Sequence, residues 1–424
     1  MLILLLAYYL AQSVHSKAGL IPASIDLREV ASYDGQYSQR SLVNIVWSCL
    51  STIFLCTWVA VHPNVHFRAE KQNQRWTEKW LWDPLHEIIT YKLPLFLWAL
   101  LVPEYILSWA IRQYLQAGVI SAKVPGWTRT HGHFMIMGGF HLFRLPADAP
   151  CIESSKSANF IVAPAVTELK DRGKSDALTK ILVLVQTLWF VIQCIARGFQ
   201  RLPLPELEVV TLAYATLNLF SYVFWWDKPR NVECPIRVYK TSTVSHKEAG
   251  KQAKEWDENW VERWPWMILW YTVGAQDDYI TLSEETSIPM FWSGRIDDNH
   301  LGSAGLGASI LGSAFGGIHC IAWSSEFPSR SELVLWRVSC AAMVAVPFTV
   351  TLFCATMAID YRMGQNKPWW VVITMFLCLI LLVLSAWFYV ASRIATLIIA
   401  FTTLRSLPPT AFTTVDWTTF IPHI

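Results

Sequence analysis

The chain has 424 residues, of which 53% are hydrophobic and 16% charged, and its formal net charge is +2. Because an ordinary soluble domain carries roughly 25% charged residues, this deficit indicates a membrane protein. No basic patch of the kind that binds nucleic acid is present. The nine cysteines include no C-x-x-C pair, which argues against a disulfide framework or a zinc site.

The first sixteen residues, MLILLLAYYLAQSVHS, form a short apolar stretch that ends near Ser13 and Ser16. Such a stretch is too short to cross a bilayer, which takes about 20 apolar residues. We expect a cleaved signal peptide over residues 1–16, followed by an N-terminal segment over 17–40. A retained segment at the membrane surface is the alternative.

Seven apolar segments have the length to cross a bilayer. With no water to satisfy backbone groups, continuous apolar runs cross as helices. The sequence therefore predicts an all-α polytopic integral membrane protein whose first partner is the lipid bilayer of the endomembrane system or the plasma membrane. The segments are Ser41–Val61 and Leu93–Ile111 (region 41–111), Lys180–Ala196 and Val209–Trp226 (180–226), and Gly305–Trp323, Trp336–Ile359 and Trp369–Tyr389 (305–390).

The last part of the chain, residues 391–424, is expected to hold one further helix and a tail. Its apolar stretch, Ile394–Leu404, is too short to cross unaided and follows Ser392 and Arg393. We expect a separate interfacial or docked helix there, ended by Pro408 and Pro409.

Two long polar loops, residues 112–179 and 227–304, separate the groups of predicted spans. Two spans lie between them, so we expect both loops on one side of the membrane. Basic residues beside the spans favour the cytoplasmic side, whereas a cleaved signal peptide predicts the opposite side. Both orientations stay open.

Glu104 lies in the second predicted span, directly after the helix-breaking Pro103. Carboxylates at bilayer depth are rare and usually functional. We expect Glu104 to face the bundle interior beside another polar group, and it is the first catalytic or ion-binding candidate.

His319 is the second candidate. The fifth predicted span reads GLGASILGSAFGGIHC, with Gly312 and Gly316 four residues apart. Small residues at that period let two helix backbones approach closely. His319 is expected on this face, either as a neutral His bonded to a backbone carbonyl or as a ligand or proton relay.

Polar residues at helical spacing mark the third and fourth spans. The third carries Gln186 and Gln193, and the fourth carries Tyr214 and Asn218. Hydrogen bonds between helices would explain them. Together with Glu104 and His319 they would instead line a polar, substrate-binding cavity.

An acidic segment in the second loop, AQDDYITLSEE, places Asp277, Thr281 and Glu285 at intervals of four. This spacing is similar to the second magnesium motif of class I terpene cyclases, and oxygen ligands so arranged suit Mg²⁺. Tyr279 departs from that motif, and no aspartate-rich partner motif precedes it. The sequence favours a solvated acidic turn, so no cofactor or metal is expected, with Mg²⁺ as the alternative.

Several stretches resemble a large family of polytopic membrane proteins from mushroom-forming fungi: VNIVWSCLSTIFLCTWVAVHPN, FGGIHCIAW, LWRVSC and SLPPTAFTTVDWTTFIPHI. The resemblance implies a membrane protein and suggests a link to fungal specialised metabolism, but it assigns no site residues. We expect a protein that handles a small lipophilic or ionic solute. The alternative is a membrane-embedded enzyme acting on a lipophilic metabolite such as a terpenoid, so enzyme activity stays open.

Overall fold

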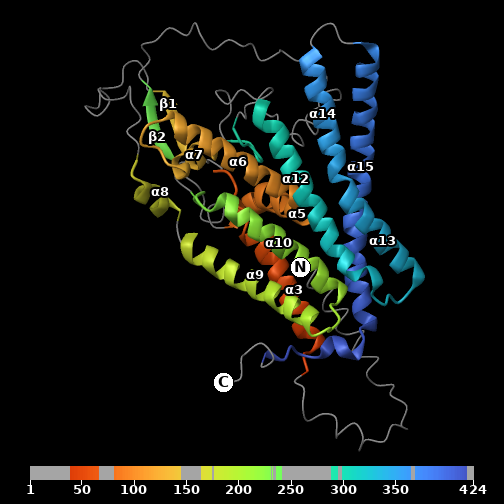
Figure 1. The fold of residues 1–424 in the computed structure, drawn as a ribbon. Coiled ribbons are helices and arrows are strands. Elements are labelled where there is room, and N and C mark those ends of the chain that lie inside the picture. The colour runs from red at the N-terminus through yellow and green to blue at the C-terminus, as the bar shows by residue number, and fades with distance from the viewer. Residues whose placement is uncertain are drawn as a thin grey trace, which may run out of the picture.

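The computed structural model describes residues 39–65, 81–144, 164–173, 176–230, 232, 235–240, 288–294, 298–363 and 368–417 (Figure 1). Within them the protein is a helical bundle with one short strand pair. The elements are α3 Leu42–Phe54, η1 Leu55–Val59, α4 Asp83–Glu87, η3 Ile88–Lys92, α5 Leu93–Leu101, α6 Pro103–Lys123, α7 Arg129–Ile136, β1 Phe140–Arg144, α8 Val166–Arg172, α9 Asp176–Phe199, α10 Glu206–Trp225, β2 Ile236–Lys240, α12 Asp298–His319, η6 Cys320–Ser324, α13 Arg330–Ala345, α14 Pro347–Met363, α15 Trp369–Thr402, η8 Thr403–Ser406 and η9 Pro409–Phe412.

Five helical stretches of the described chain are long and apolar enough to cross a membrane: Leu42–Val59, Leu178–Phe199, Glu206–Trp225, Arg330–Phe353 and Trp369–Ser406. A sixth candidate is a bent pair, Asp83–Leu101 with Pro103–Lys123, whose halves meet at 107°. The prediction of a helical membrane protein is confirmed at this level.

One end of the bundle, which we call the loop end, is built around Lys228 just after α10. Its Nζ donates to the backbone oxygen of His62, which follows α3 and η1, and to Gln113 Oε1 on α6. Lys180, near the start of α9, donates to the backbone oxygens of Trp226 and Lys228. Thus α3 and α10 finish, and α9 starts, at the loop end.

The opposite end, which we call the terminal end, joins the two ends of the described chain. Arg40 pairs with Glu208 at the start of α10, and the Arg40 backbone N–H donates to Phe412 O at 2.8 Å. Arg197, near the finish of α9, donates to Thr413 O at 2.7 Å. The segments around residues 40 and 412 therefore lie together.

The bent pair α5–α6 forms a hairpin that enters and leaves through the loop end. Tyr91, before α5, donates to the backbone oxygen of Asn64, and Gln113 of α6 donates to Asn64 Oδ1 at 3.0 Å. Between these arms, Glu104 contacts Gly312 of α12 in the middle of the bundle. The predicted helix Leu93–Ile111 was wrong as one continuous helix, because the chain breaks at Val102.

The small residues of α12 allow close contact with α13 and α14, as their spacing predicted. A Cβ added to Gly316 would lie 2.6 Å from the Met343 backbone carbon, so only glycine fits there. Ser313 donates to Val344 O and Ser309 to Pro347 O. These contacts place α12 antiparallel to α13–α14.

Two further boundaries differ from the prediction. The stretch Ile394–Leu404 is not a separate helix, because α15 continues without a break from Trp369 to Thr402. The first polar loop begins later than expected, because α6 extends to Lys123. Both helices continue because no proline or glycine interrupts them at the predicted ends.

The two loops each contribute one strand, β1 and β2, which pair in parallel from Phe140 with Ile236 to Arg144 with Lys240. The pairing joins the loops beside α7 at the loop end (Figure 1).

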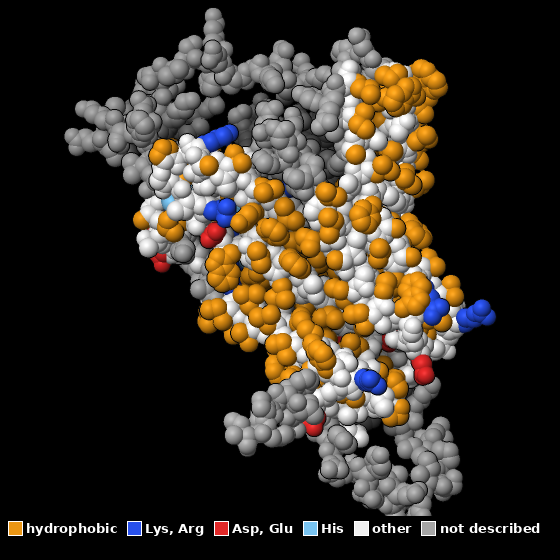
Figure 2. All heavy atoms as spheres, viewed as in Figure 1, with side chains coloured by type: hydrophobic (Ala, Val, Ile, Leu, Met, Phe, Trp, Pro, Cys, Tyr) orange, Lys and Arg blue, Asp and Glu red, His pale blue; other side chains and the backbone are white. Residues whose placement is uncertain are grey.

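The outer face of the bundle is apolar. Figure 2 shows hydrophobic side chains spread over the middle of the visible face, with most Lys, Arg, Asp and Glu side chains toward its ends. On α9, for example, Ile181, Val185 and Ile192 are exposed. Side chains of this kind are compatible with contact to membrane lipid.

Candidate site at the helix break

The break between α5 and α6 follows from Pro103. A residue before proline is disfavoured in helical conformation, and proline has no N–H to donate. Val102 accordingly has φ −139° and ψ 62°, and Pro103 becomes the first residue of α6. The break leaves carbonyl oxygens at the end of α5 without helical partners.

Side chains from α10 and α15 donate hydrogen bonds to these carbonyl oxygens. The Tyr214 hydroxyl donates to Leu100 O, and Arg393 Nε donates to Leu101 O at 3.3 Å. Arg393 Nη2 also donates to the Tyr214 hydroxyl at 2.7 Å. A charged side chain from a distant helix therefore stabilises the break.

Arg393 is fully buried, and acceptors and rings surround its guanidinium. In addition to the oxygens already described, Met343 Sδ lies 3.5 Å from Nη1, and the guanidinium carbon lies 4.1 Å from the centre of the Phe315 ring. We call Leu100 O, Leu101 O, Tyr214, Phe315 and Met343 the Arg393 cage. Every member is an acceptor or a π face, so the cage suits a cation.

Glu104 lies in the first turn of α6, beside this cage. Its charge acts on Arg393 and Tyr389, but no ion pair within 4 Å joins Glu104 to Arg393. The Glu104 carboxyl interacts with the Tyr389 hydroxyl, although neither Glu104 Oε2 nor that hydroxyl makes a well-aligned hydrogen bond. The expectation that Glu104 faces the interior beside polar groups is confirmed.

His319 is the last residue of α12 and is fully buried. Its Nδ1 lies 2.9 Å from Phe315 O, and its Nε2 has no hydrogen-bond partner. The ring packs against Phe315 and Trp336. Phe315 therefore contacts both His319 and Arg393.

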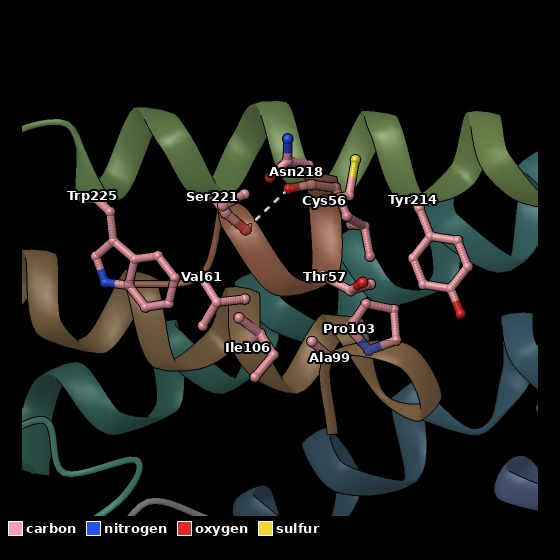
Figure 3. A pocket seen from close by; sticks show the side chains of 12 residues that line it. Cys56, Thr57, Val61, Ala99, Pro103, Ile106, Tyr214, Asn218, Ser221 and Trp225 are labelled. Carbon is pink, nitrogen blue, oxygen red and sulfur yellow. Dashed lines mark hydrogen bonds between the residues drawn. The ribbon is translucent and has the colours of Figure 1, made fainter. Parts of the chain in front are cut away.

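A small cavity runs along α10 from the cage toward the loop end (Figure 3). Tyr214 and Trp225 lie at its two ends, and Thr57, Asn218 and Ser221 supply polar groups between them. Its volume of about 20 Å³ gives room for about one water molecule. Asn218 Nδ2 is buried without a partner.

The structure separates the predicted substrate-binding residues into two groups. Tyr214 and Asn218 line the cavity, whereas Gln186 and Gln193 are half-buried on α9 and are not among the lining residues. The acidic segment with Asp277, Thr281 and Glu285 lies outside the described residues. Among the described residues, no group of three or more His, Cys, Asp or Glu side chains is arranged to hold a metal ion.

At the loop end, Lys228 occupies a second cage. Its ammonium donates to three oxygens, including Gln113 Oε1 at 2.8 Å, and lies 4.6 Å and 4.9 Å from the Trp109 and Trp225 rings. Burial and the neighbouring Lys180 lower the pKa of Lys228 well below its usual range, while the three acceptors favour its charged form.

Two buried histidines accompany Lys228. Burial, followed by the charges of Lys180 and Lys228, lowers the pKa of His62 well below its usual range. Burial and the charges of Lys228 and Arg129 lower the pKa of His133 to about 3, and neither ring nitrogen of His133 has a hydrogen-bond partner.

The sequence did not identify Arg393 or Lys228 as site residues. Arg393 was interpreted as a boundary residue, although it interrupts an apolar run that continues on both sides. That position alone was the available signal, because charged residues inside membrane helices are usually functional. Lys228 follows a span closely, so the sequence alone does not distinguish it from the other basic residues that flank spans.

A region that covers 57% of the chain identifies its family. A model of a family of unknown function, DUF8562, matches residues 4–245. The protein belongs to this family. No curated protein and no solved structure matches the chain. The matched region contains Glu104, Tyr214 and Lys228, whereas His319 and Arg393 lie beyond it.

Proposed function

We propose that this protein is a membrane transport protein that binds a small ionic solute at the break between α5 and α6. The observation that supports the proposal is the buried meeting of a broken helix with Glu104 and Arg393. Transporters use the free carbonyls and helix ends of discontinuous helices as ion and substrate sites near the middle of the bilayer. Irregular backbone at that depth is tolerated only inside protein or beside water.

The cavity supports an ionic rather than a bulky lipophilic solute. It holds about one water molecule in this conformation, and it is lined by both hydroxyl and amide groups. A solute on this route would pass Trp225, Ser221 and Asn218 before reaching Tyr214 and the break. We place the protein in the endomembrane system or the plasma membrane.

For the membrane topology, we propose six crossings rather than seven. The crossings are α3, α9, α10, α12, the pair α13–α14, and α15, with α5–α6 as a re-entrant hairpin. The contacts of Asn64 with both hairpin arms support this path, as does the proximity of residues 40 and 412. Both termini would then lie opposite the two long loops.

Flux measurements test the function. The full-length protein, reconstituted into vesicles that contain a pH-sensitive dye or a sodium-sensitive dye, should carry protons or sodium ions when a membrane potential is imposed. Glu104→Gln should reduce this flux at least tenfold because it removes the carboxylate at the break. Glu206→Gln is the matched control, since Glu206 is a buried carboxyl in the first turn of α10 at the terminal end. Wild-type flux no faster than that of empty vesicles, or full flux with Glu104→Gln, contradicts the proposal.

A further inference from the structure

The Arg393 cage has the composition of a cation-binding site, and the cation that it holds is the side chain of Arg393 itself. Two backbone oxygens, a hydroxyl and a thioether accept from the guanidinium at 2.7–3.5 Å, and the Phe315 ring covers its face. No N–H donor faces it in these contacts. Such a shell selects a planar cation, because a guanidinium offers N–H donors in one plane and two faces for stacking.

Three polar groups beside the cage make no hydrogen bond to Arg393. The Glu104 carboxyl and the Tyr389 hydroxyl interact with each other without a well-aligned hydrogen bond, and His319 Nε2 is buried without a hydrogen-bond partner. Tyr389 and His319 are 4% and 0% exposed, so water does not satisfy them from the surface. Unpaired polar groups of this kind are rare in folded proteins and call for an explanation such as an absent ligand.

The cage and the cavity share one residue, Tyr214. Tyr214 lines the cavity and also belongs to the cage, accepting from Arg393 and donating to Leu100 O. Arg393 is carried on a long, flexible side chain whose guanidinium is held by hydrogen bonds rather than by a direct ion pair. A small cation arriving along α10 would meet the same oxygens that Arg393 now occupies.

We propose that the cage is a binding site for a guanidinium-type or other small organic cation, with Arg393 as its resident occupant and Glu104 as the countercharge. The solute displaces Arg393 by competing for Leu100 O, Leu101 O, Tyr214 and the Phe315 face. The assignment of this cation as the transported solute rests on the proposed function, whereas binding to the cage does not.

Replacement of Arg393 tests the cage directly. Arg393→Ala leaves a space with the shape and charge of guanidinium, so millimolar guanidinium chloride should raise the thermal unfolding temperature of this variant in detergent. Urea, which is a neutral molecule of the same shape, and sodium chloride at equal ionic strength should not. The wild-type protein, in which guanidinium has to displace Arg393, should show a smaller rise that is also absent with urea.

A double variant tests the countercharge. Adding Glu104→Gln to Arg393→Ala should weaken the apparent guanidinium affinity about tenfold, which corresponds to about 1.4 kcal/mol. Equal effects of guanidinium and urea on Arg393→Ala, or no effect of guanidinium, overturn the cage.

Uptake by vesicles that contain the wild-type protein requires no variant. It therefore tests the proposed cation even if Arg393→Ala does not fold. Vesicles with the wild-type protein should take up radiolabelled guanidinium and not urea. Guanidinium binding without uptake overturns the cation as solute while the cage stands. If the protein binds guanidinium but carries neither protons nor sodium ions, the proposed function is contradicted and the proposal of a cation site in the cage stands.

Discussion

Two buried cations in this bundle are held in similar ways, yet their surroundings differ in one respect. Lys228 at the loop end and Arg393 at the centre each donate to oxygens and lie against aromatic rings. Among the described residues, no carboxylate takes part in the contacts of Lys228, whereas Glu104 lies beside Arg393. The comparison teaches that a cage whose cation gives its hydrogen bonds to neutral acceptors, which we call saturated, can serve structure alone, while a cage beside a carboxylate can accept a charged ligand.

The terminal end supplies a reference for a closed ion pair. There Arg40 contacts Glu208 directly, and Arg197 Nε lies 3.8 Å from the same carboxylate. The charges at the centre are opposite as well, but they do not touch. Direct pairing therefore joins the segments at the terminal end, whereas Glu104 and Arg393 are not joined in this way.

The largest expected effect comes from removing one wall of the Arg393 cage. Gly316→Leu should prevent assembly, because even a Cβ at this position would lie 2.6 Å from the Met343 backbone. Met343 and Phe315 would be forced apart, so the Arg393 cage would be lost. The yield of monodisperse protein after detergent extraction checks this.

Gly317→Ala is the matched control, since nothing lies within 4 Å of a Cβ there. It should assemble normally and gain about 1 kcal/mol of helix propensity. Equal yields from Gly316→Leu and the wild type would contradict the packing argument.

The next effect concerns the saturated cage. Lys228→Met removes the ammonium and leaves acceptors from Gln113, Asn64 and His62 without their donor. We expect a loss of about 2–4 kcal/mol in the free energy of unfolding, since buried polar groups left unpaired are costly. Thermal unfolding measures the loss, and ion flux per folded molecule should stay unchanged. A selective loss of flux with normal stability would assign Lys228 to the solute route.

Acidification should destabilise the loop end. The unfolded chain protonates His133 near pH 6.5, whereas its folded pKa is about 3. The folded state thus binds fewer protons between these values, so stability falls as the pH drops from about 6.5 toward 3. The slope is at most about 1.4 kcal/mol per pH unit for each such histidine.

His133→Phe should reduce this slope of unfolding temperature against pH, while His86→Gln should not, because His86 is exposed. A slope unchanged by His133→Phe would show that other groups cause the acid sensitivity.

The smallest effect is expected on α9. Gln186→Leu and Gln193→Leu change half-buried residues that do not line the cavity, so unfolding temperature and flux should both stay close to wild type. Surface substitutions of this kind usually change stability by less than about 0.5 kcal/mol. A large loss of flux in Gln193→Leu would restore the original expectation that α9 contributes to solute binding.

The sequence by itself determined the membrane class, most helices and two members of the central site. Long apolar runs can only be helices in lipid, so periodicity and length are enough to find them. Glu104 and His319 were recognisable because ionisable or imidazole groups inside apolar runs are rare. The Gly312 and Gly316 spacing likewise predicted close helix contact, which the Met343 contact bears out.

Only the tertiary structure decided how the second apolar run is used. A proline in a sequence indicates a kink, but the 107° return of α5–α6 depends on which groups meet the free carbonyls. Those groups are Tyr214 and Arg393, which lie 114 and 293 residues away from Leu100 in the chain. Hydrogen bonds between such distant residues leave no local pattern, so the cage around Arg393 and the saturated cage around Lys228 could be found only once the helices were packed.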